Sequence, residues 1–428
     1  MRVHLSLVGI LTAAGCIDFY PESTDSGPGP EVGSCDPRAT IPTGNLPGAP
    51  VPALPHSDEL GSAPQPESVH LSWPDTDPSR SIAVLWKTDV DTRASLIEYG
   101  PSEGFPDNAI RAEGYSVLFG GGVVGEGTDV VHEVRLCEVL TPDTTYSYRV
   151  GGEGAWSPVY TFTTPGAPGS FDTFRVGIAG DSRGAYSTWG DLLAAMDSHE
   201  PDFFLFSGDM VELGVNQIEW DAWFAASQDI LARKVLVPSH GNHEFLAQHY
   251  FAQWALPGEE EYFAIEYGDA IVVSLNDTVA DPTRITTDQV AFMNRVFSET
   301  EARTKIALHH QPIYSTCTRH GSATELRQDW EPVYDAHDVD FVFAGHNHIY
   351  ERSVPIRGAA EVPDGEGTVY FVTGGAGAPL YDSVEGEWFG KVANPIEHYI
   401  IADFSPTGVD FVVRDLSGTV IDTYSVPR

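Results

Sequence analysis

Residues 69–164 carry short runs in which apolar and polar positions alternate, separated by turn residues. The runs are VHLSW, SIAVLW, ASLIEYG, HEVRLCEVL, TYSYRVG and VYTFTT, with Pro, Gly and Asp between them. A period of two predicts strands that bury one face, and short strands at this spacing predict an antiparallel β-sandwich. We therefore expect an all-β domain at residues 67–165.

From residue 171 onward the pattern changes to continuous apolar strands that alternate with amphipathic stretches. Strands such as FRVGIAG, DFFLFSG, AIVVSLND and DFVFAGH have no polar alternation, and helical stretches such as NQIEWDAWFAASQDI follow several of them. This arrangement predicts an α/β domain with a buried sheet, which we assign to residues 171–428. The segment PGAPGS before it is typical of a linker.

The first sixteen residues predict export. Arg2 precedes an apolar run that ends in Ala13-Ala14-Gly15, directly before Cys16. The run is too short to span a bilayer and fits a secretory signal. The small residues before Cys16 resemble a bacterial lipobox, which implies cleavage before Cys16, lipidation of its sulfur and a lipid-anchored protein of the bacterial cell envelope, facing the periplasm or the cell surface. A cytoplasmic N-terminus with a chance cysteine is the alternative.

Residues 17–66 are rich in Pro, Gly, Ser and Asp and have almost no periodic apolar pattern. This composition predicts a disordered tether between the lipid anchor and the folded domains. After Cys16, three cysteines remain: Cys35, Cys137 and Cys317. One disulfide with three candidate pairings is compatible with them, and the absence of a CxxC pair leaves cysteine-ligated zinc without support.

The composition limits the partners. The chain has 428 residues, enough for a large buried core, and 23 Lys+Arg against 62 Asp+Glu give a formal net charge of −39. Such a surface repels phosphate backbones and anionic headgroups, so no nucleic-acid partner is expected, and the membrane is expected only through the lipid on Cys16. No pattern indicates an oligomeric state.

Five predicted strands end in side chains that bind metals. Ligands of open α/β sheets gather at the carboxyl ends of the strands, so these residues can converge on one cleft. Carboxylate, amide and imidazole groups suit Zn, Mn or Fe. A single Gly-Asp would be an ordinary turn, but turn chemistry does not require imidazole at three strand ends. The five ends are Gly180-Asp181, Gly208-Asp209, Gly241-Asn242-His243-Glu244, His309-His310-Gln311-Pro312 and Gly345-His346-Asn347-His348.

In this order the motifs resemble those of the calcineurin-like metallophosphoesterases, and GHNHIYER together with HQPIY resembles the purple acid phosphatases in particular. The stretch LTPDTTYSYRVGG, followed by SPVYTFTTPG, resembles the late strands of a fibronectin type III module. Plant-type purple acid phosphatases carry such a domain ahead of the catalytic one. The resemblance covers residue 69 to the end and implies a four-layer αββα sandwich after an all-β fibronectin type III or immunoglobulin-like domain.

When the family's ligand positions are matched to this sequence, the resemblance implies a centre of two metal ions, which would be Fe, Zn or Mn. Asp209 would bridge both ions. Asp181 and His348 would complete one site, and Asn242, His310 and His346 the other.

Two further histidines match the family by position. His243 matches its general acid beside the leaving group. His320, ten residues after His310, lies where the family places a substrate-contacting histidine, although an ordinary surface histidine is the alternative. His309 precedes the ligand position and is expected to pack beside the site.

Two positions depart from the family. The second motif of purple acid phosphatases reads GDxxY, and its tyrosinate gives the colour, whereas this chain has Glu212 in the place of the tyrosine. Purple colour is therefore not expected, and the Glu212 carboxylate would either bind metal or point into solvent. Arg183 stands where relatives have Gly or a ligating His. We expect its guanidinium to bind phosphate oxygens, with a structural ion pair as the alternative.

These features predict metal-dependent hydrolysis of a small phosphate ester, and the resemblance favours monoesters. A phosphodiesterase on the same metal frame is an alternative, because the loops at residues 316–326 and 381–391 carry no readable specificity code. A second alternative is a surface protein that binds a partner and whose phosphatase-like body is inert. That alternative requires the loss of ligands, and all six of the expected ligands are present.

Overall fold

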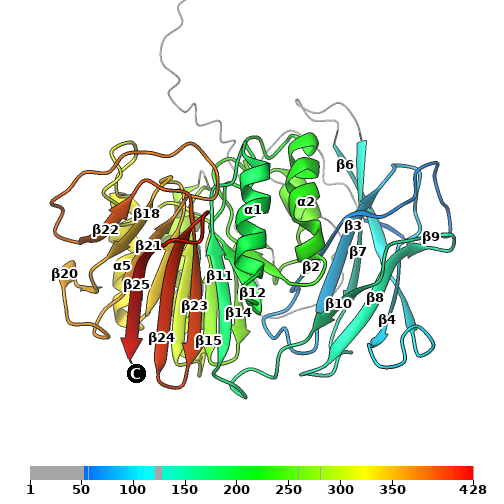
Figure 1. The fold of residues 1–428 in the computed structure, drawn as a ribbon, viewed down its shortest axis with the longest axis horizontal. Coiled ribbons are helices and arrows are strands. Elements are labelled where there is room, and N and C mark those ends of the chain that lie inside the picture. The colour runs from blue at the N-terminus through cyan, green and yellow to red at the C-terminus, as the bar shows by residue number, and fades with distance from the viewer. Residues whose placement is uncertain (1–52, 56, 121–127, 259, 280, 428) are drawn as a thin grey trace, which may run out of the picture.

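The computed structural model describes residues 53–55, 57–120, 128–258, 260–279 and 281–427. A β-sandwich, blue to cyan in Figure 1, lies beside an α/β domain coloured from green to red. The predicted signal, Cys16 and residues 17–52 of the predicted tether lie outside the described residues. Within the described ranges, no helix has the length and apolar character needed to cross a bilayer.

The N-terminal domain consists of two antiparallel sheets, with strand orders β1-β6-β7-β3-β2 and β10-β8-β4-β5, and β9 pairs with β8. The alternation read from the sequence is visible on β10, where Phe162 is buried and Thr161 and Thr163 are exposed. The strands are β1 Ala53–Pro55, β2 Glu67–Ser72, β3 Ile82–Thr88, β4 Leu96–Pro101, β5 Ile110–Glu113, β6 Tyr115–Gly120, β7 Thr128–Leu136, β8 Thr145–Gly152, β9 Ala155–Trp156 and β10 Tyr160–Thr163.

The α/β domain contains two sheets, with orders β13-β12-β11-β23-β24-β25 and β14-β15-β16-β17-β21-β18-β22, and a small β19-β20 pair. Strands β11, β12 and β13 are parallel, as are β15, β16, β17 and β21. The strands are β11 Phe174–Ala179, β12 Phe203–Phe206, β13 Leu236–Pro238, β14 Phe263–Tyr267, β15 Ala270–Ser274, β16 Thr304–His309, β17 Phe341–Ala344, β18 Tyr350–Ser353, β19 Ile356–Arg357, β20 Ala360–Glu361, β21 Val369–Thr373, β22 Gly390–Asn394, β23 His398–Ser405, β24 Gly408–Asp415 and β25 Val420–Pro427.

Helices cover the outer faces of both sheets. The side chain of Asn216 caps α2 by accepting from the Ile218 amide, and the buried residues Trp220, Trp223 and Phe224 recur at helical spacing. Helices α1 and α2 lie between the six-stranded sheet and the β-sandwich (Figure 1). The helices are α1 Tyr186–Asp197, α2 Gln217–Leu231, α3 Gln248–Gln253, α4 Val290–Glu299 and α5 Thr324–Ala336, and a π-helical turn, η1 Arg284–Gln289, precedes α4.

The seven-stranded sheet divides its side chains between two cores. On β17, Phe341 and Phe343 face the six-stranded sheet, where Phe341 packs 4.8 Å from Phe411 between ring centroids. Val342 faces the opposite way, into the cluster that contains Trp330 of α5. Successive strand residues point to opposite faces, so the strand is apolar on both. The result is helix, sheet, sheet, helix, the four-layer αββα order expected from the sequence.

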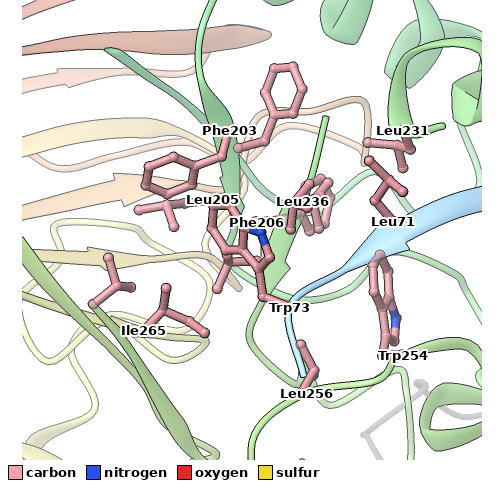
Figure 2. Close-up of a cluster of buried hydrophobic side chains, with 14 of the residues drawn as sticks. Leu71, Trp73, Phe203, Leu205, Phe206, Leu231, Leu236, Trp254, Leu256 and Ile265 are labelled. Atoms are coloured by element: carbon pink, nitrogen blue, oxygen red, sulfur yellow. The ribbon is translucent and has the colours of Figure 1, made fainter. Parts of the chain in front are cut away.

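The sandwich packs directly on the α/β domain. Leu71 and Trp73 point into the same hydrophobic cluster as Phe203 and Leu236 (Figure 2), and the ring centroids of Trp73 and Phe203 are 5.3 Å apart. Polar contacts add to this interface, since the Tyr148 hydroxyl donates to the Ala232 carbonyl at 2.6 Å. One continuous core therefore spans both domains.

The structure differs from the predicted tether at its C-terminal end. Residues 53–66 were expected to belong to the tether, but β1 pairs with β6, and the Glu59 carbonyl accepts from the Arg93 amide at 2.8 Å. Backbone hydrogen bonds make these contacts, which an apolar periodicity cannot reveal. Cys137 is disulfide-bonded and Cys317 is a free, buried thiol, so the two pairings that use Cys317 are excluded.

Candidate metal centre

Polar side chains from both sheets of the α/β domain meet at one edge. The carboxyl ends of parallel strands lie at the same edge of a sheet, and the two sheets are packed face to face. Residues that are far apart in the sequence therefore converge there. These residues are Asp181 after β11, Asp209 after β12, Asn242 after β13, His310 after β16, and His346 and His348 after β17.

Two groups of possible metal ligands form at this edge, and Asp209 belongs to both. One group joins Asp209, His310 and His346, and the other joins Asp181, Asp209 and His348. Within each group the ligand atoms lie within 4.8 Å of one another. A carboxylate has two oxygens and can bind two cations at once, so the arrangement fits two metal ions that share Asp209.

The amide of Asn242 adds an oxygen to the first group. Its Oδ1 lies 2.9 Å from Nε2 of His310 and 3.0 Å from Nδ1 of His346. Three different loops therefore bring these atoms together. Oxygen and imidazole nitrogen together form the donor set that Zn, Mn and Fe accept.

Backbone carbonyls orient two of the imidazoles. His310 Nδ1 donates to the Ser207 carbonyl at 2.8 Å, and His348 Nδ1 donates to the Pro379 carbonyl at 2.7 Å. A carbonyl oxygen only accepts, so the proton sits on Nδ1 and Nε2 is directed into the site. Histidines that bind metals are commonly held in this way by a carbonyl or carboxylate behind the ring.

The electrostatics of the buried groups favour a cation. Burial disfavours charge on both Asp209 and His310, but several attractions together outweigh it: the two groups attract each other, His243 also attracts Asp209, and Asp181 and Asp277 also attract His310. The pKa of Asp209 therefore lies below its ordinary value and the pKa of His310 above. Burial, together with the nearby His310, lowers the pKa of His346 and keeps that imidazole neutral. The ionised Asp209 and the neutral His346 are in the state that binds a metal, and a metal bound by His310 would displace the proton that the raised pKa retains.

Three of these residues occupy an unusual backbone conformation. Asp181, Asp209 and His346 have φ angles of 61°, 56° and 63°. This left-handed region costs a non-glycine residue about 1–2 kcal/mol, and such conformations gather at functional sites. The preceding glycine permits the close approach of the strand ends, since a Cβ on Gly345 would lie 2.2 Å from Asp181 Oδ2.

Glu244 braces the loops that carry the ligands. Its Oε2 accepts from the amides of Asp209 at 2.9 Å and Gly241 at 2.7 Å, and its Oε1 accepts from the Met210 amide at 2.7 Å. The side chain is fully buried. Burial, reinforced by the negative charge of Asp209, raises the pKa of Glu244 to about 7. Glu244 belongs to the Gly241-Asn242-His243-Glu244 motif, but the sequence alone assigned it no role.

His243 is held with one ring nitrogen toward the site. Its Nδ1 donates to the Glu212 carbonyl at 2.7 Å, and its amide donates to Asp209 Oδ1 at 2.9 Å. The ring is therefore oriented so that Nε2 lies 3.9 Å from Asp209 Oδ2. The imidazole is partly exposed, which leaves it accessible to a bound molecule.

Arg183 and Glu212, the two departures from the family pattern, contact each other. Arg183 Nη1 lies 2.5 Å from Glu212 Oε2, and Nε lies 3.6 Å from Asp209 Oδ2. The ion pair that was the alternative for Arg183 is thus present, but Nε is buried and has no hydrogen-bond partner among the described residues. Glu212 belongs to neither group of possible ligands, and its 46% exposed side chain pairs with arginine.

His320 lies at the rim of the site, with its ring centroid 4.3 Å from that of His346. The sequence did not indicate Tyr381, whose ring is stacked on that of His348 with a centroid distance of 4.2 Å and an interplanar angle of 16°. No local motif marks this tyrosine, because it reaches the site from the long connection between β21 and β22. His309 points away, toward Asp277, with Nδ1 3.1 Å from Oδ2.

Comparison with known proteins agrees with this architecture. Residues 66–164 match the family model for the purple acid phosphatase N-terminal domain, and residues 174–350 match the calcineurin-like phosphoesterase model. The chain is a purple acid phosphatase-like member of the calcineurin-like metallophosphoesterases. As a phosphoesterase of this family, it is expected to carry a dinuclear metal centre, for which the two groups above supply the side chains.

Relatives of this phosphoesterase are found in plants. Purple acid phosphatase 22 of Arabidopsis thaliana is 27% identical over 69% of this chain and 68% of the relative, and purple acid phosphatase 18 of the same plant is 28% identical over 76% of each. A purple acid phosphatase from yellow lupin (Lupinus luteus) seeds superimposes with a TM-score of 0.76 at 20% identity, covering 85% of this chain and 74% of that one. At that identity the lupin structure supports the fold alone.

Proposed function

We propose that this phosphoesterase hydrolyses phosphate monoesters at a centre of two metal ions, and that Asp209 is the ligand they share. The observation that carries the proposal is the overlap of two three-residue groups at Asp209. Asp181 and His348 would complete one site, and Asn242, His310 and His346 the other.

The bound ions would neutralise charge on the phosphoryl group and activate a water molecule at neutral pH. The protein's own residues supply position. The Nε atom of Arg183 lies near Asp209 Oδ2. It is buried and has no hydrogen-bond partner among the described residues. A phosphate oxygen would provide that partner, and a guanidinium can hold two such oxygens at once. When no substrate is bound, the ion pair with Glu212 would limit the rotation of the Arg183 side chain.

His243 would protonate the leaving oxygen. Its Nδ1 is committed to the Glu212 carbonyl, so Nε2 is the atom that can carry and release a proton toward the site. A single well-placed acid contributes about 10²–10⁴-fold in rate. No covalent enzyme intermediate is needed, because phosphoryl transfer depends mainly on positioning and electrostatics.

The choice of monoesters is supported by the phosphatase relatives and is tested by one assay. The protein, supplied with Mn²⁺ or Zn²⁺ or treated with chelator, is offered 4-nitrophenyl phosphate and bis(4-nitrophenyl) phosphate. We expect the monoester to be turned over faster, and only with metal. Faster turnover of the diester would select a phosphodiesterase, and no turnover of either substrate after metal loading would favour an inert binding protein.

His243→Ala tests the proton donor. We expect kcat to fall about 10²–10⁴-fold for an alkyl monoester such as ethyl phosphate, whose leaving group needs a proton. The loss should be much smaller with 4-nitrophenyl phosphate, whose leaving group departs as a stable anion. His337→Ala, which changes a histidine on the outside of the domain, is the control. Equal losses on the two substrates would contradict the assignment.

A further inference from the structure

Two loops of this chain form one wall beside the candidate metal centre. We call residues 315–321 and 379–384 the paired loops. The Thr318 amide donates to the Asp382 carbonyl at 2.8 Å, the Val384 amide donates to the Thr316 carbonyl at 2.9 Å, and Cys317 forms a β-bridge with Ser383. The paired residues are more than sixty positions apart in the sequence, and these contacts join the two segments into one structural unit.

The paired loops are fixed to the loop that carries His346 and His348. Between these two histidines, Asn347 donates from Nδ2 to Ser315 Oγ at 2.7 Å and to the Gly321 carbonyl at 2.9 Å. The Tyr381 amide donates to the His348 carbonyl at 3.0 Å. Asn347 is fully buried, so its hydrogen bonds do not compete with water. The wall consequently has a defined position relative to the metal centre.

Arg319 projects from this wall next to Tyr381. Its guanidinium carbon lies 5.0 Å from the centroid of the Tyr381 ring, which is itself stacked on His348. Arg183 reaches the same tyrosine from the other end, with Nη2 3.5 Å from the hydroxyl. Two guanidinium groups, one deep and one at the rim, are thus arranged around a single ring.

Arg319 differs from Arg183 in its partners. No carboxylate among the described residues forms an ion pair with it, although the chain has 62 Asp+Glu residues. Arg319 is also exposed. Contact with a ring face engages the flat surface of a guanidinium and leaves the N–H groups at its edge free to donate. In a chain with a net charge of −39, an oriented cation without a carboxylate partner among the described residues is available to bind an anion from outside.

We propose that Arg319 binds a second anionic group, carried by the leaving group of the substrate. The enzyme then prefers phosphate monoesters whose alcohol bears a carboxylate or a further phosphate a few bonds from the ester oxygen. The ester phosphate would lie at the metal centre, in contact with Arg183. The second anion would bind Arg319, which is separated from His348 by the ring of Tyr381. This inference rests on the proposed function and names its substrate class.

Matched substrates test the proposal and separate the two anions. Each pair consists of two monoesters that differ only in the second anionic group. In the first pair, phosphoglycolate is compared with the analogue in which an amide replaces its carboxylate. In the second pair, ethane-1,2-diol bisphosphate is compared with 2-hydroxyethyl phosphate. We expect kcat/KM to be about tenfold or more higher for the more anionic member of at least one pair, which is the effect of one charge-assisted hydrogen bond. The pair that shows the preference identifies the second anion.

Substitution of Arg319 locates the effect. In Arg319→Gln, the ratio of the two kcat/KM values within each pair should fall close to one. Arg319→Lys should keep part of the preference because the charge remains. The matched control is Arg327→Gln, because Arg327 lies over Tyr314 in the same way, 4.6 Å from the ring centroid, but on α5. That variant should keep the full preference. A preference absent in the unaltered protein, or unchanged in Arg319→Gln, would overturn the proposal.

A binding measurement separates this inference from the proposed function. In calorimetric titrations of the metal-loaded protein, 3-phosphonopropionate should bind about tenfold more tightly than its amide, and Arg319→Gln should remove the difference. If no monoester were hydrolysed but the binding difference held, the proposed reaction would fail while the anion site stood. Equal binding of acid and amide, with normal turnover of monoesters, would refute the anion site alone.

Discussion

Asp209 lies in both groups of candidate ligands, in a left-handed backbone conformation with φ 56°. Its carboxylate is almost fully buried, which raises its pKa, but the attractions of His310 and His243 together outweigh the cost of burial and bring the pKa below the ordinary value. A carboxylate held ionised inside a protein needs compensating positive charge. At the scale of single residues, the place of Asp209 in both ligand groups is what indicates a site for two cations.

Asp209→Ala should therefore remove both metal ions together. Asn242→Ala touches only one of the two groups and should preferentially loosen one ion. Elemental analysis after gel filtration measures the content, and Asp410→Ala, on the exposed side of β24, is the control. Unaltered metal content in Asp209→Ala would rule out the shared ligand.

Glu244→Gln tests the brace behind the site. An amide presents one accepting oxygen and turns its NH₂ toward backbone amides that also donate, so at least one of the three hydrogen bonds is lost. We expect the free energy of unfolding to fall by about 1–3 kcal/mol, and metal affinity to weaken because the backbone of Asp209 loses its support. Urea unfolding and metal titration measure the two effects. Glu385→Gln, on an exposed loop, should change neither.

At the scale of elements, the sequence predicted the strands and helices that have a strong apolar pattern. The run AIVVSLND became β15 and NQIEWDAWFAASQDI became α2. The paired loops carried no such pattern, because backbone hydrogen bonds between distant segments hold them. The same reason applies to β1, which pairs with β6 through backbone groups.

His132 on β7 gives the β-sandwich a dependence on pH. Its ring nitrogens lie 2.7 Å from Thr88 Oγ1 and 2.9 Å from Ser95 Oγ. Burial, together with the nearby charge of Arg93, lowers the pKa of His132 to about 3. An unfolded chain would protonate this histidine near pH 6.5, so between these values the unfolded state binds more protons. The titration of His132 therefore leaves the free energy of unfolding unchanged above about pH 6.5, and lowers it progressively as the pH falls from there toward 3.

His132→Gln should reduce this decline. Urea unfolding gives the free energy of unfolding at each pH. Between pH 7 and pH 4.5 we expect this free energy to fall more for the unaltered protein than for the variant, and the two slopes should differ by at most about 1.4 kcal/mol per pH unit. His337→Gln removes a half-buried histidine and should alter the slope less. Parallel slopes for His132→Gln and the unaltered protein would contradict a buried, neutral His132.

At the scale of the whole molecule, the two domains share one hydrophobic core. Leu71 and Trp73 of the sandwich lie among side chains from the α/β domain (Figure 2). Burial of this kind resembles a domain interior more than a transient interface. The sandwich therefore stabilises the domain that carries the candidate metal centre.

Trp73→Ala should destabilise both domains together. Trp73 is 4% exposed, and removal of a buried tryptophan costs about 3–5 kcal/mol. We expect calorimetry to show one unfolding transition, shifted as a whole to lower temperature. The control is Trp156→Ala, a less buried tryptophan on β9 of the same domain, with a smaller shift. A new transition for the sandwich alone, with the α/β domain unfolding at its original temperature, would show that the domains are independent.

The sequence by itself determined the two domain types and the six candidate ligands, because apolar periodicity and short motifs such as Gly345-His346-Asn347-His348 are local properties of the chain. Only the tertiary structure decided which groups surround those ligands. Arg183 meets Glu212, Tyr381 stacks on His348, and Arg319 lies over that tyrosine. These contacts join segments far apart in the sequence, and their geometry arises only when the strand ends of two packed sheets meet at one edge.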